Sequence, residues 1–355
     1  MPEQWASKVL GTLRMKTNGI PKIESVYPGA VIPGGEITIR GTGFANGNHV
    51  RPAVRFGSAE GSLVMASENE LRARVPDDAD SSAISVYAGQ KESQPYPIYL
   101  GTLVADNLHP VANPAVDREG NVYVTFSGQR GQKVPVSLYK VTPNRTVKPF
   151  VTQLMNPSGL ALDREGVLYV TCRNDGTVHR VTPDGTSEQW IEGMGIATGI
   201  AFDHTGNLYV GDRSGTIFKI DAERQIFVFA TLEPSMAAYH MAFHPNGDLY
   251  VSGPTTSSFD RVYKISPAGE VDVFFRGMGR PQGMAFDRAG NLYIAGSLGG
   301  RRGIARVAPD GTADFVLGGN NIAGMALQPS GRAYVATNSA LYGVEWNVEG
   351  IPLPV

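Results

Sequence analysis

Two histidines are the side chains in this sequence best suited to acid–base chemistry. His109 lies in the stretch NLHP, and His240 precedes the apolar run MAF. An imidazole titrates near neutral pH, so it can take up or release a proton during catalysis. The two histidines belong to separate segments, and His240 is equally explained as a residue hydrogen-bonded to a neighbouring repeat unit. Both are candidate catalytic residues.

A nucleophilic cysteine is not expected. Cys172 is the only cysteine among the 355 residues, so neither an internal disulfide nor a cysteine-rich metal site can form. It ends the apolar run YVTC, and no histidine that could activate the thiol stands beside it in the sequence. We interpret Cys172 as a buried or half-buried thiol.

The overall composition excludes several classes of protein. The chain has 31 basic and 33 acidic residues, a formal charge of −2, which gives no general attraction to nucleic acid. No apolar stretch approaches the roughly 20 residues that cross a bilayer, and the N-terminus lacks the apolar core of a secretory signal. We expect a soluble, cytoplasmic protein that binds neither nucleic acid nor membrane; a location outside the cytoplasm stays open.

A repeated phrase supplies the elements that must position any site. The pattern D-x-x-G-x-hydrophobic-Tyr-Val recurs six times with small variations, from DREGNVYV to QPSGRAYV. Successive tyrosines are 46, 40, 41, 43 and 41 residues apart, close to the roughly 40–45 residues of a four-stranded propeller blade. The sequence therefore predicts a six-bladed β-propeller over 99–355. The aligned residues are Tyr123, Tyr169, Tyr209, Tyr250, Tyr293 and Tyr334.

Each repeat is interpreted as four strands. A small apolar inner strand leads into the D-x-x-G turn, where Asp accepts backbone hydrogen bonds and Gly tolerates positive φ. The tyrosine strand follows, with its ring expected between blades, and then an alternating third strand and an outer strand. We expect residues near 97–105 to supply the outer strand of the last blade, whose other strands come from 322–346. The tail, 347–355, should then lie beyond the ring.

Ligands of a propeller usually bind over the central channel, where loops lead into the inner strands and link second to third strands. Counted from the repeat, one residue leads into each inner strand, and the next is glycine in four blades but Asn113 and His240 in the other two. The loops after the second strands add charged and amide side chains. The candidate ligand-binding residues are Asn113, Ser158, Arg173, Asp212, Arg213, Tyr239, His240, Gln282 and Asn338.

The repeat resembles NHL repeats and the related gluconolactonase (senescence-marker) family of six-bladed propellers over about 101–355. That resemblance implies a divalent cation, Ca²⁺ or Mg²⁺, held by Glu, Asn and Asp side chains, which would polarise a lactone carbonyl and its attacking water. The candidate metal ligands are Asn113 and Asp212. The sequence departs from the family at Ser158 and Gln282, where Asn or Asp is typical, and at Ala112, where the family's glutamate is absent. No other cofactor is predicted.

Residues 21–98 lack the repeat. Short alternating strands separated by Gly and Pro turns predict a sandwich of roughly 80 residues. The segment resembles the IPT/TIG immunoglobulin-like domain, which implies a spacer or protein-contact role. DNA contact is not expected, because the segment has no dense basic stripe. The resemblance rests on Pro28, Gly34–Gly35, Ile39–Phe44, Phe56–Gly57, and Leu71 followed by Val75–Pro76.

Residues 1–20 form a separate N-terminal segment. Trp5, Val9 and Leu13 are spaced four residues apart, so they would share one face of a helix. This helix either packs on its own chain or docks to a partner. We predict that residues 1–100 contact a protein partner.

Two classes of function are consistent with these features. The first is a non-catalytic interaction protein whose propeller binds a protein or small ligand over the channel, and whose N-terminal module docks it to an assembly. The alternative is a divergent metal-dependent hydrolase, lactonase-like, or a lyase, which would use Asn113, His240 and Asp212. Sugar binding is a third hypothesis, with Tyr239 as the aromatic platform. The sequence leaves open whether the protein is an enzyme.

Overall fold

The structure, a computed structural model, describes residues 19–44, 51–257 and 259–353. Within these ranges every regular element is a β-strand, which confirms the all-β prediction, and no described helix could span a membrane. The chain forms two compact units: the described residues up to 27 with 36–98, and 28–35 with 99–355. Most of the predicted docking helix, 1–18, lies outside the described residues.

The N-terminal unit is an antiparallel sandwich whose strands follow the order β1-β3-β6-β5-β4-β7-β8, with β9 beside β7. Alternate residues face its core, where Ile37, Ile39 and Leu71 are fully buried. Gly41 permits a close approach of strands, because a Cβ there would lie 2.0 Å from the Lys22 carbonyl oxygen. The strands are β1 (Lys22–Tyr27), β3 (Glu36–Thr42), β4 (Ala53–Phe56), β5 (Ala59–Ala66), β6 (Glu70–Arg74), β7 (Ala83–Ala88), β8 (Lys91–Glu92) and β9 (Tyr96–Pro97).

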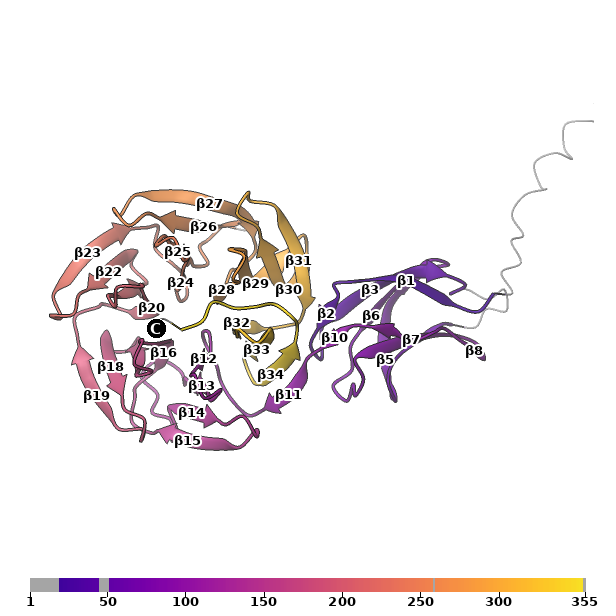
Figure 1. Cartoon of the computed structure of the whole chain (residues 1–355), viewed down its shortest axis with the longest axis horizontal. Coiled ribbons are helices and arrows are strands. Elements are labelled where there is room, and N and C mark those ends of the chain that lie inside the picture. Colours follow the sequence, from indigo (N-terminus) through magenta and orange to yellow (C-terminus); the bar gives the residue numbers. More distant parts are fainter. Residues whose placement is uncertain (1–18, 45–50, 258, 354–355) are drawn as a thin grey trace, which may run out of the picture. The chain divides into compact units, whose positions relative to one another are not determined.

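The second unit is a ring of six blades around a central axis (Figure 1). Neighbouring strands within each blade pair antiparallel, and the innermost strand of each blade faces the axis. From the inside outward the first three blades are β12 (Ala115–Val116), β13 (Val122–Thr125), β14 (Leu138–Val141) and β15 (Val147–Val151); β16 (Pro157–Leu162), β17 (Leu168–Cys172), β18 (Thr177–Val181) and β19 (Ser187–Ile191); and β20 (Ala197–Phe202), β21 (Leu208–Asp212), β22 (Thr216–Ile220) and β23 (Ile226–Thr231). The last three are β24 (His240–Phe243), β25 (Leu249–Ser252), β26 (Asp260–Ile265) and β27 (Val271–Met278); β28 (Met284–Phe286), β29 (Leu292–Leu298), β30 (Arg301–Val307) and β31 (Ala313–Gly318); and β32 (Ile322–Leu327), β33 (Arg332–Thr337), β34 (Leu341–Glu345) and β11 (Thr102–Ala105).

The repeated residues build the turns and the contacts between blades. Asp117 Oδ1 accepts hydrogen bonds from the backbone N–H groups of Glu119 and Asn121, at 3.0 and 2.8 Å, and Gly120 has a φ of 82°. This is the turn chemistry that the D-x-x-G phrase predicts. The ring of Tyr169 packs edge-on against Phe202 of the next blade, at a centroid distance of 5.0 Å. The expected position of the tyrosines between blades is thereby confirmed.

Strands from before the first repeat close the ring. β11 pairs antiparallel with β34, as the sequence predicts. Blade 5 is extended by two further strands that the sequence analysis did not anticipate: β2 (Ala30–Val31) pairs parallel with β31, and β10 (Tyr99–Leu100) pairs parallel with β2. Ala30 and Val31 therefore belong to a propeller sheet although they fall inside the stretch assigned to the sandwich. Their pairing covers the outer edge of blade 5.

The C-terminal tail does not lie beyond the ring, which corrects the prediction. It crosses one face of the propeller toward the centre (Figure 1). The backbone N–H of Gly350 donates to the Gln328 carbonyl at 2.9 Å, and the Arg288 N–H donates to the Glu349 carbonyl at 2.8 Å. Apolar tail residues stabilise this course, because Val348 and Ile351 pack against buried hydrophobic clusters of the blades.

The tail borders a pocket of about 700 Å³ at the far ends of the inner strands, which we call the tail-face pocket. All six inner strands contribute apolar side chains to it, and Ile351 and Leu353 of the tail line its rim. This mouth of the channel is therefore an apolar cavity partly closed by the chain itself. Its apolar lining includes Leu160, Ile200, Met241, Met284 and Met325.

Candidate functional site

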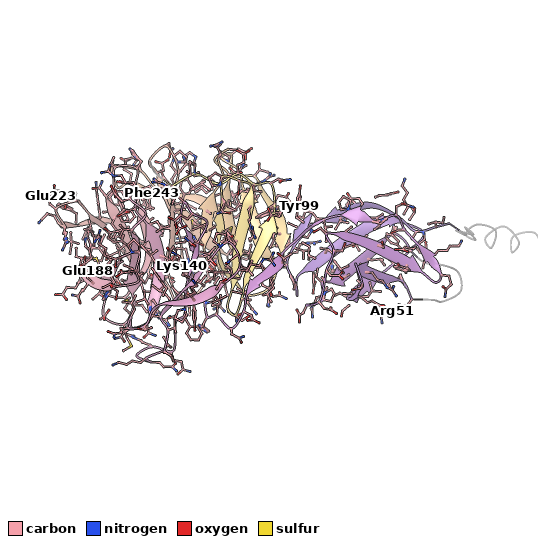
Figure 2. All side chains as sticks on the ribbon, turned by 60° about the horizontal axis from the view of Figure 1, so that its bottom comes forward. Arg51, Tyr99, Lys140, Glu188, Glu223 and Phe243 are labelled. Atoms are coloured by element: carbon pink, nitrogen blue, oxygen red, sulfur yellow. The ribbon has the colours of Figure 1, made fainter. Side chains whose placement is uncertain are left out.

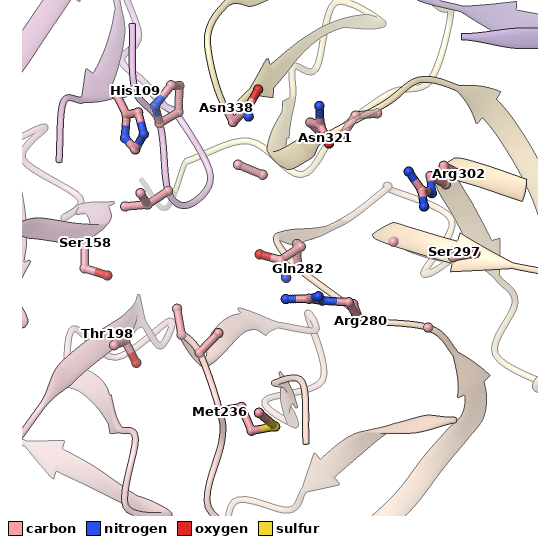
Figure 3. A pocket seen from close by; sticks show the side chains of 18 of the residues that line it. His109, Ser158, Thr198, Met236, Arg280, Gln282, Ser297, Arg302, Asn321 and Asn338 are labelled. Atoms are coloured by element: carbon pink, nitrogen blue, oxygen red, sulfur yellow. The ribbon is translucent and has the colours of Figure 1, made fainter. Parts of the chain in front are cut away.

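A second pocket, of about 880 Å³, opens where loops lead into the inner strands; we call it the channel-face pocket (Figure 3). Its volume is within the roughly 300–1,000 Å³ of small-molecule sites. All six blades or the loops leading into them contribute to its lining, which holds no Asp or Glu and no Phe, Tyr or Trp among the described residues. The lining side chains that carry hydrogen-bonding groups are His109, Ser158, Arg173, Thr198, Arg213, Arg280, Gln282, Ser297, Arg302, Asn321 and Asn338.

Four arginines give this pocket its charge. Arg173 follows β17 and Arg213 follows β21, while Arg280 precedes β28 and Arg302 lies on β30. None of the four forms an ion pair with a described carboxylate. Arg180, on an outer part of blade 2, does form an ion pair, because it lies 3.5 Å from the carboxylate of Glu188. The Glu188 side chain projects outward (Figure 2).

Arg173 is the most constrained of the four. One of its terminal nitrogens donates to the Gly128 carbonyl at 3.1 Å, whereas its buried Nε has no hydrogen-bond partner among the described residues. Burial lowers the pKa of Arg173, and the positive charges of Arg213 and Arg130 lower it further. The pocket thus holds like charges close together.

Neutral hydrogen-bonding groups fill the space between the arginines. Figure 3 shows Gln282 and Arg280 side by side, both extending into the open space of the pocket, with Arg302 directed toward them. Ser158 and Asn338 lie on other sides of the same space. Neither of these two side chains hydrogen-bonds to another residue that the structure describes. Asn338 is exposed and free to bind a ligand, whereas Ser158 is only 1% exposed.

The structure brings six of the predicted site residues into this one pocket. They come from five blades or the loops leading into them, at the same end of the inner and second strands. His109 is exposed at the rim, with its ring 6.1 Å from that of Phe126. The six are His109, Ser158, Arg173, Arg213, Gln282 and Asn338.

Asn113 does not line the channel-face pocket. Its amide nitrogen donates to the Met284 carbonyl at 2.7 Å, and its carbonyl oxygen accepts from the Met325 N–H at 3.1 Å. A Cβ on Gly283 or Gly324 would lie 2.0 or 2.4 Å from that oxygen. Asn113 therefore joins blade 1 to blades 5 and 6 near the axis, and both glycines are needed to admit it.

Asp212 and Tyr239 also lie outside the channel-face pocket. The Asp212 carboxylate accepts from the Ile196 N–H at 2.7 Å and from the Ser214 hydroxyl. Tyr239 is 2% exposed, and its hydroxyl donates to the Glu233 carbonyl. Local hydrogen bonds thus occupy one proposed metal ligand, and burial removes the proposed aromatic platform.

His240 is buried behind the pocket rather than facing it. Its side chain is 4% exposed, and its Nε2 has no partner among the described residues. Burial lowers the pKa of His240 to about 4, an effect that the neighbouring Gln282 side chain opposes. The imidazole is therefore neutral at pH 7. His109 and His240 do not meet in one pocket, so the predicted acid–base pair does not form.

Sequence reasoning did not select Arg280, Arg302 or Asn321, which line the channel-face pocket. Their place in the repeat could have pointed to two of them. Arg280 and Asn321, like Asn156, stand two residues before the residue that leads into the inner strand of their blade. All three have positive φ, at 50, 54 and 51°. Arg280 thus places a charged side chain at the edge of the pocket, at the position where two other blades have asparagine.

The residues present do not fit the divalent cation that the resemblance implies. No three His, Cys, Asp or Glu side chains come together in the described part of the chain. Both candidate ligands, Asn113 and Asp212, are engaged in the structural hydrogen bonds described above. The channel-face lining is basic and free of carboxylates, so it would repel a cation, and no metal-dependent step is assigned to it.

Comparison with protein families identifies the N-terminal unit. Residues 21–98 match the model of the IPT/TIG domain. No curated protein matches the chain as a whole. The chain is thus an IPT/TIG domain followed by a β-propeller, as its residues suggest.

Solved structures identify the class of propeller. A Bacteroides thetaiotaomicron protein of unknown function matches over 92% of this chain and 98% of its own, with a TM-score of 0.58 and 16% identity. An auxiliary nutrient binding protein from the same organism matches over 92% and 98%, at 0.55 and 13%. A gluconolactonase from Xanthomonas campestris matches over 68% and 88%, at 0.58 and 15%. These likenesses confirm the gluconolactonase-like fold.

Proposed function

We propose that this protein is a non-catalytic binding protein whose propeller holds a small molecule in the channel-face pocket. One observation carries the proposal: all six blades contribute to an 880 Å³ cavity, and eleven of the side chains that line it are hydrogen-bond donors or acceptors. Convergent polar groups in a preformed concave site are the usual mark of specific ligand binding. The fold of the nutrient binding protein from Bacteroides thetaiotaomicron supports this choice.

A catalytic role has less support from the same lining. Hydrolysis or elimination needs a general base, a nucleophile or a metal beside the substrate. The channel-face pocket offers His109 at its rim, while His240, Asp212 and Cys172 are buried and do not line it. Burial raises the pKa of Cys172 to about 12, so its thiol stays protonated at neutral pH.

The test is a metabolite library screened by thermal shift on the full-length protein, with hits measured by isothermal titration calorimetry. We expect at least one compound with a Kd of about 1–100 μM, corresponding to binding of roughly 5–8 kcal/mol. The variant Gln282→Ala/Asn338→Ala should weaken it tenfold or more. The control Ser330→Ala, an exposed substitution in a turn bordering the tail-face pocket, should leave it unchanged.

The enzyme alternative is tested on the same preparation. A panel of lactones, assayed with and without added Ca²⁺, should show no turnover above background. A kcat/KM above about 10⁴ M⁻¹s⁻¹, a typical enzyme value, would refute the binding-only proposal. The predicted contact of residues 1–100 with a protein partner stays a prediction.

A further inference from the structure

We infer that the channel-face pocket takes an anionic ligand, a hydroxylated small molecule that carries carboxylate, sulfate or phosphate oxygens. The inference rests on the proposed function and names its ligand class. The charge of the pocket differs from that of the whole chain. The whole chain carries −2, yet the pocket concentrates Arg173, Arg213, Arg280 and Arg302 with no acidic residue in its lining.

The donors of these arginines are largely unused. The guanidinium groups of Arg280 and Arg302 form no hydrogen bond or ion pair with any residue that the structure describes. Arg213 makes one long bond, 3.4 Å, to the Ser235 carbonyl, and Nε of Arg173 is buried without a partner. A guanidinium presents five donors in a planar fork that matches a carboxylate, sulfate or phosphate. Oxyanions are therefore the groups that would satisfy them.

The backbone fixes the position of Arg280. Its φ is 50°, at a position where two other blades use asparagine. Its backbone N–H donates to a carboxylate oxygen of Asp260 at 3.2 Å, and Asp260 also accepts from the N–H and hydroxyl of Thr255, at 2.8 Å each. Asp260 thus fixes the loop, while the Arg280 side chain remains free to point into the pocket (Figure 3).

Two sides of the pocket carry the charge. Arg173 and Arg213 come from blades 2 and 3, and Arg280 and Arg302 come from the segment between blades 4 and 5 and from blade 5. Neutral amide and hydroxyl groups, among them Ser158 and Asn338, lie around the remaining space. This arrangement suits a ligand with an oxyanion at one or both ends and hydroxyl groups between them. The absence of Phe, Tyr and Trp from the described lining disfavours an apolar ligand.

The experiment titrates the full-length protein with inorganic pyrophosphate, sulfate and citrate in 20 mM NaCl, by calorimetry and thermal shift. We expect saturable 1:1 binding of at least one anion. The variants Arg280→Gln/Arg302→Gln and Arg173→Gln/Arg213→Gln should each weaken it at least tenfold, and raising NaCl to 200 mM should weaken it in the wild type. The control Arg164→Gln/Arg288→Gln removes two charges from exposed ion pairs elsewhere and should bind like wild type. The single variant Arg302→Gln, at an exposed site, replaces either double variant if that variant unfolds.

Two outcomes would overturn the inference. One is no saturable response to any of the three anions; the other is binding that all variants share, which would place the anion elsewhere. Neither outcome decides the proposed function. If the metabolite screen then finds only uncharged ligands that Gln282→Ala/Asn338→Ala weakens, the pocket still binds small molecules and only the ligand class is wrong. Anion binding as expected supports both.

Discussion

The two mouths of the propeller channel are built from the same six inner strands but differ in chemistry. The channel-face pocket carries four arginines and no carboxylate, and the guanidinium groups of Arg280 and Arg302 have no partner among the described residues. The tail-face pocket is lined mostly by apolar side chains of the inner strands and is crossed by the chain's own tail. A surface that keeps unsatisfied charge is available for a ligand, whereas one that buries apolar area against its own chain stabilises the fold.

The largest effect should come from the point where the chain leaves the last blade for the tail. Trp346→Ala removes a ring that is 7% exposed and lies 5.4 Å from that of Tyr293. Cavity formation at such a site costs about 3–5 kcal/mol, so the free energy of unfolding should fall by that amount in urea denaturation. Met236→Ala is the matched change in the channel-face pocket; because Met236 is 59% exposed, it should cost less than about 0.5 kcal/mol. If both variants lost the same free energy of unfolding, the two mouths of the channel would not differ in their contribution to stability.

A pH-dependent effect should appear behind the channel-face pocket. Burial lowers the pKa of His240 to about 4, from the 6.5 of the unfolded chain. As pH falls from 6.5 toward 4, the unfolded state binds a proton that the folded state excludes, so stability is complete above 6.5 and is lost on acidification. The loss amounts to about 3 kcal/mol by pH 4. His240→Gln should flatten this part of the stability curve measured by urea denaturation from pH 7.5 to 4.

The matched control for that curve is His204→Gln, which alters an exposed histidine. Carboxylates titrate in the same pH range in all three proteins, so the difference between the curves isolates the imidazole. If His240→Gln follows the wild-type curve throughout, His240 is not shielded from solvent. It would then be accessible from the channel-face pocket, and the pocket would regain a candidate base.

The repeat predicted the ring but not the direction of every side chain. The spacing of Tyr123 and its five counterparts located each blade, because turn chemistry and strand length are local. The same offsets placed Ser158 and Gln282 correctly in the channel-face pocket. They failed for Asn113 and His240. Asn113 bonds to the Met284 carbonyl of blade 5, 171 residues away, and His240 lies beside Gln282, 42 residues away at the start of blade 5. Such non-local packing leaves no mark within one repeat.

Two other features depended on contacts outside the repeat. Ala30 and Val31 resemble part of a sandwich strand, yet they pair with β31 almost 290 residues later. The tail, whose Val348 packs on the cluster around Tyr293, follows an apolar surface that exists only after the blades have assembled. Arg280 and Arg302 were missed for the same reason, since they are far in sequence from the predicted Arg173 and Arg213 and meet them only around the axis.

A smaller loss of stability should follow from Asn113→Ala near the axis. The substitution leaves the Met284 carbonyl and the Met325 N–H without their present partner. Leaving a buried polar group unsatisfied costs about 1–3 kcal/mol, and we expect about 2 kcal/mol in urea denaturation. Asn338→Ala, the same change in the channel-face pocket, should cost less than about 0.5 kcal/mol, because its amide has no described partner. A Ca²⁺-dependent stability lost with Asn113→Ala would instead show that Asn113 ligates a metal.

The smallest expected effect is a slight gain in stability from removing charge in the channel-face pocket. In 20 mM NaCl, Arg280→Gln/Arg302→Gln removes two like charges that no described carboxylate neutralises, so it should leave the free energy of unfolding unchanged or raise it by about 0.5 kcal/mol. The gain should vanish in 0.5 M NaCl, where screening shortens the reach of each charge to a few ångströms. Arg164→Gln/Arg288→Gln, which breaks two exposed ion pairs, should show no gain. A loss above about 1 kcal/mol for the pocket variant would mean that these arginines hold the fold together. The side chains of the channel-face pocket would then stabilise the fold, as those of the tail-face pocket do, and this result would contradict the proposal that they bind a ligand.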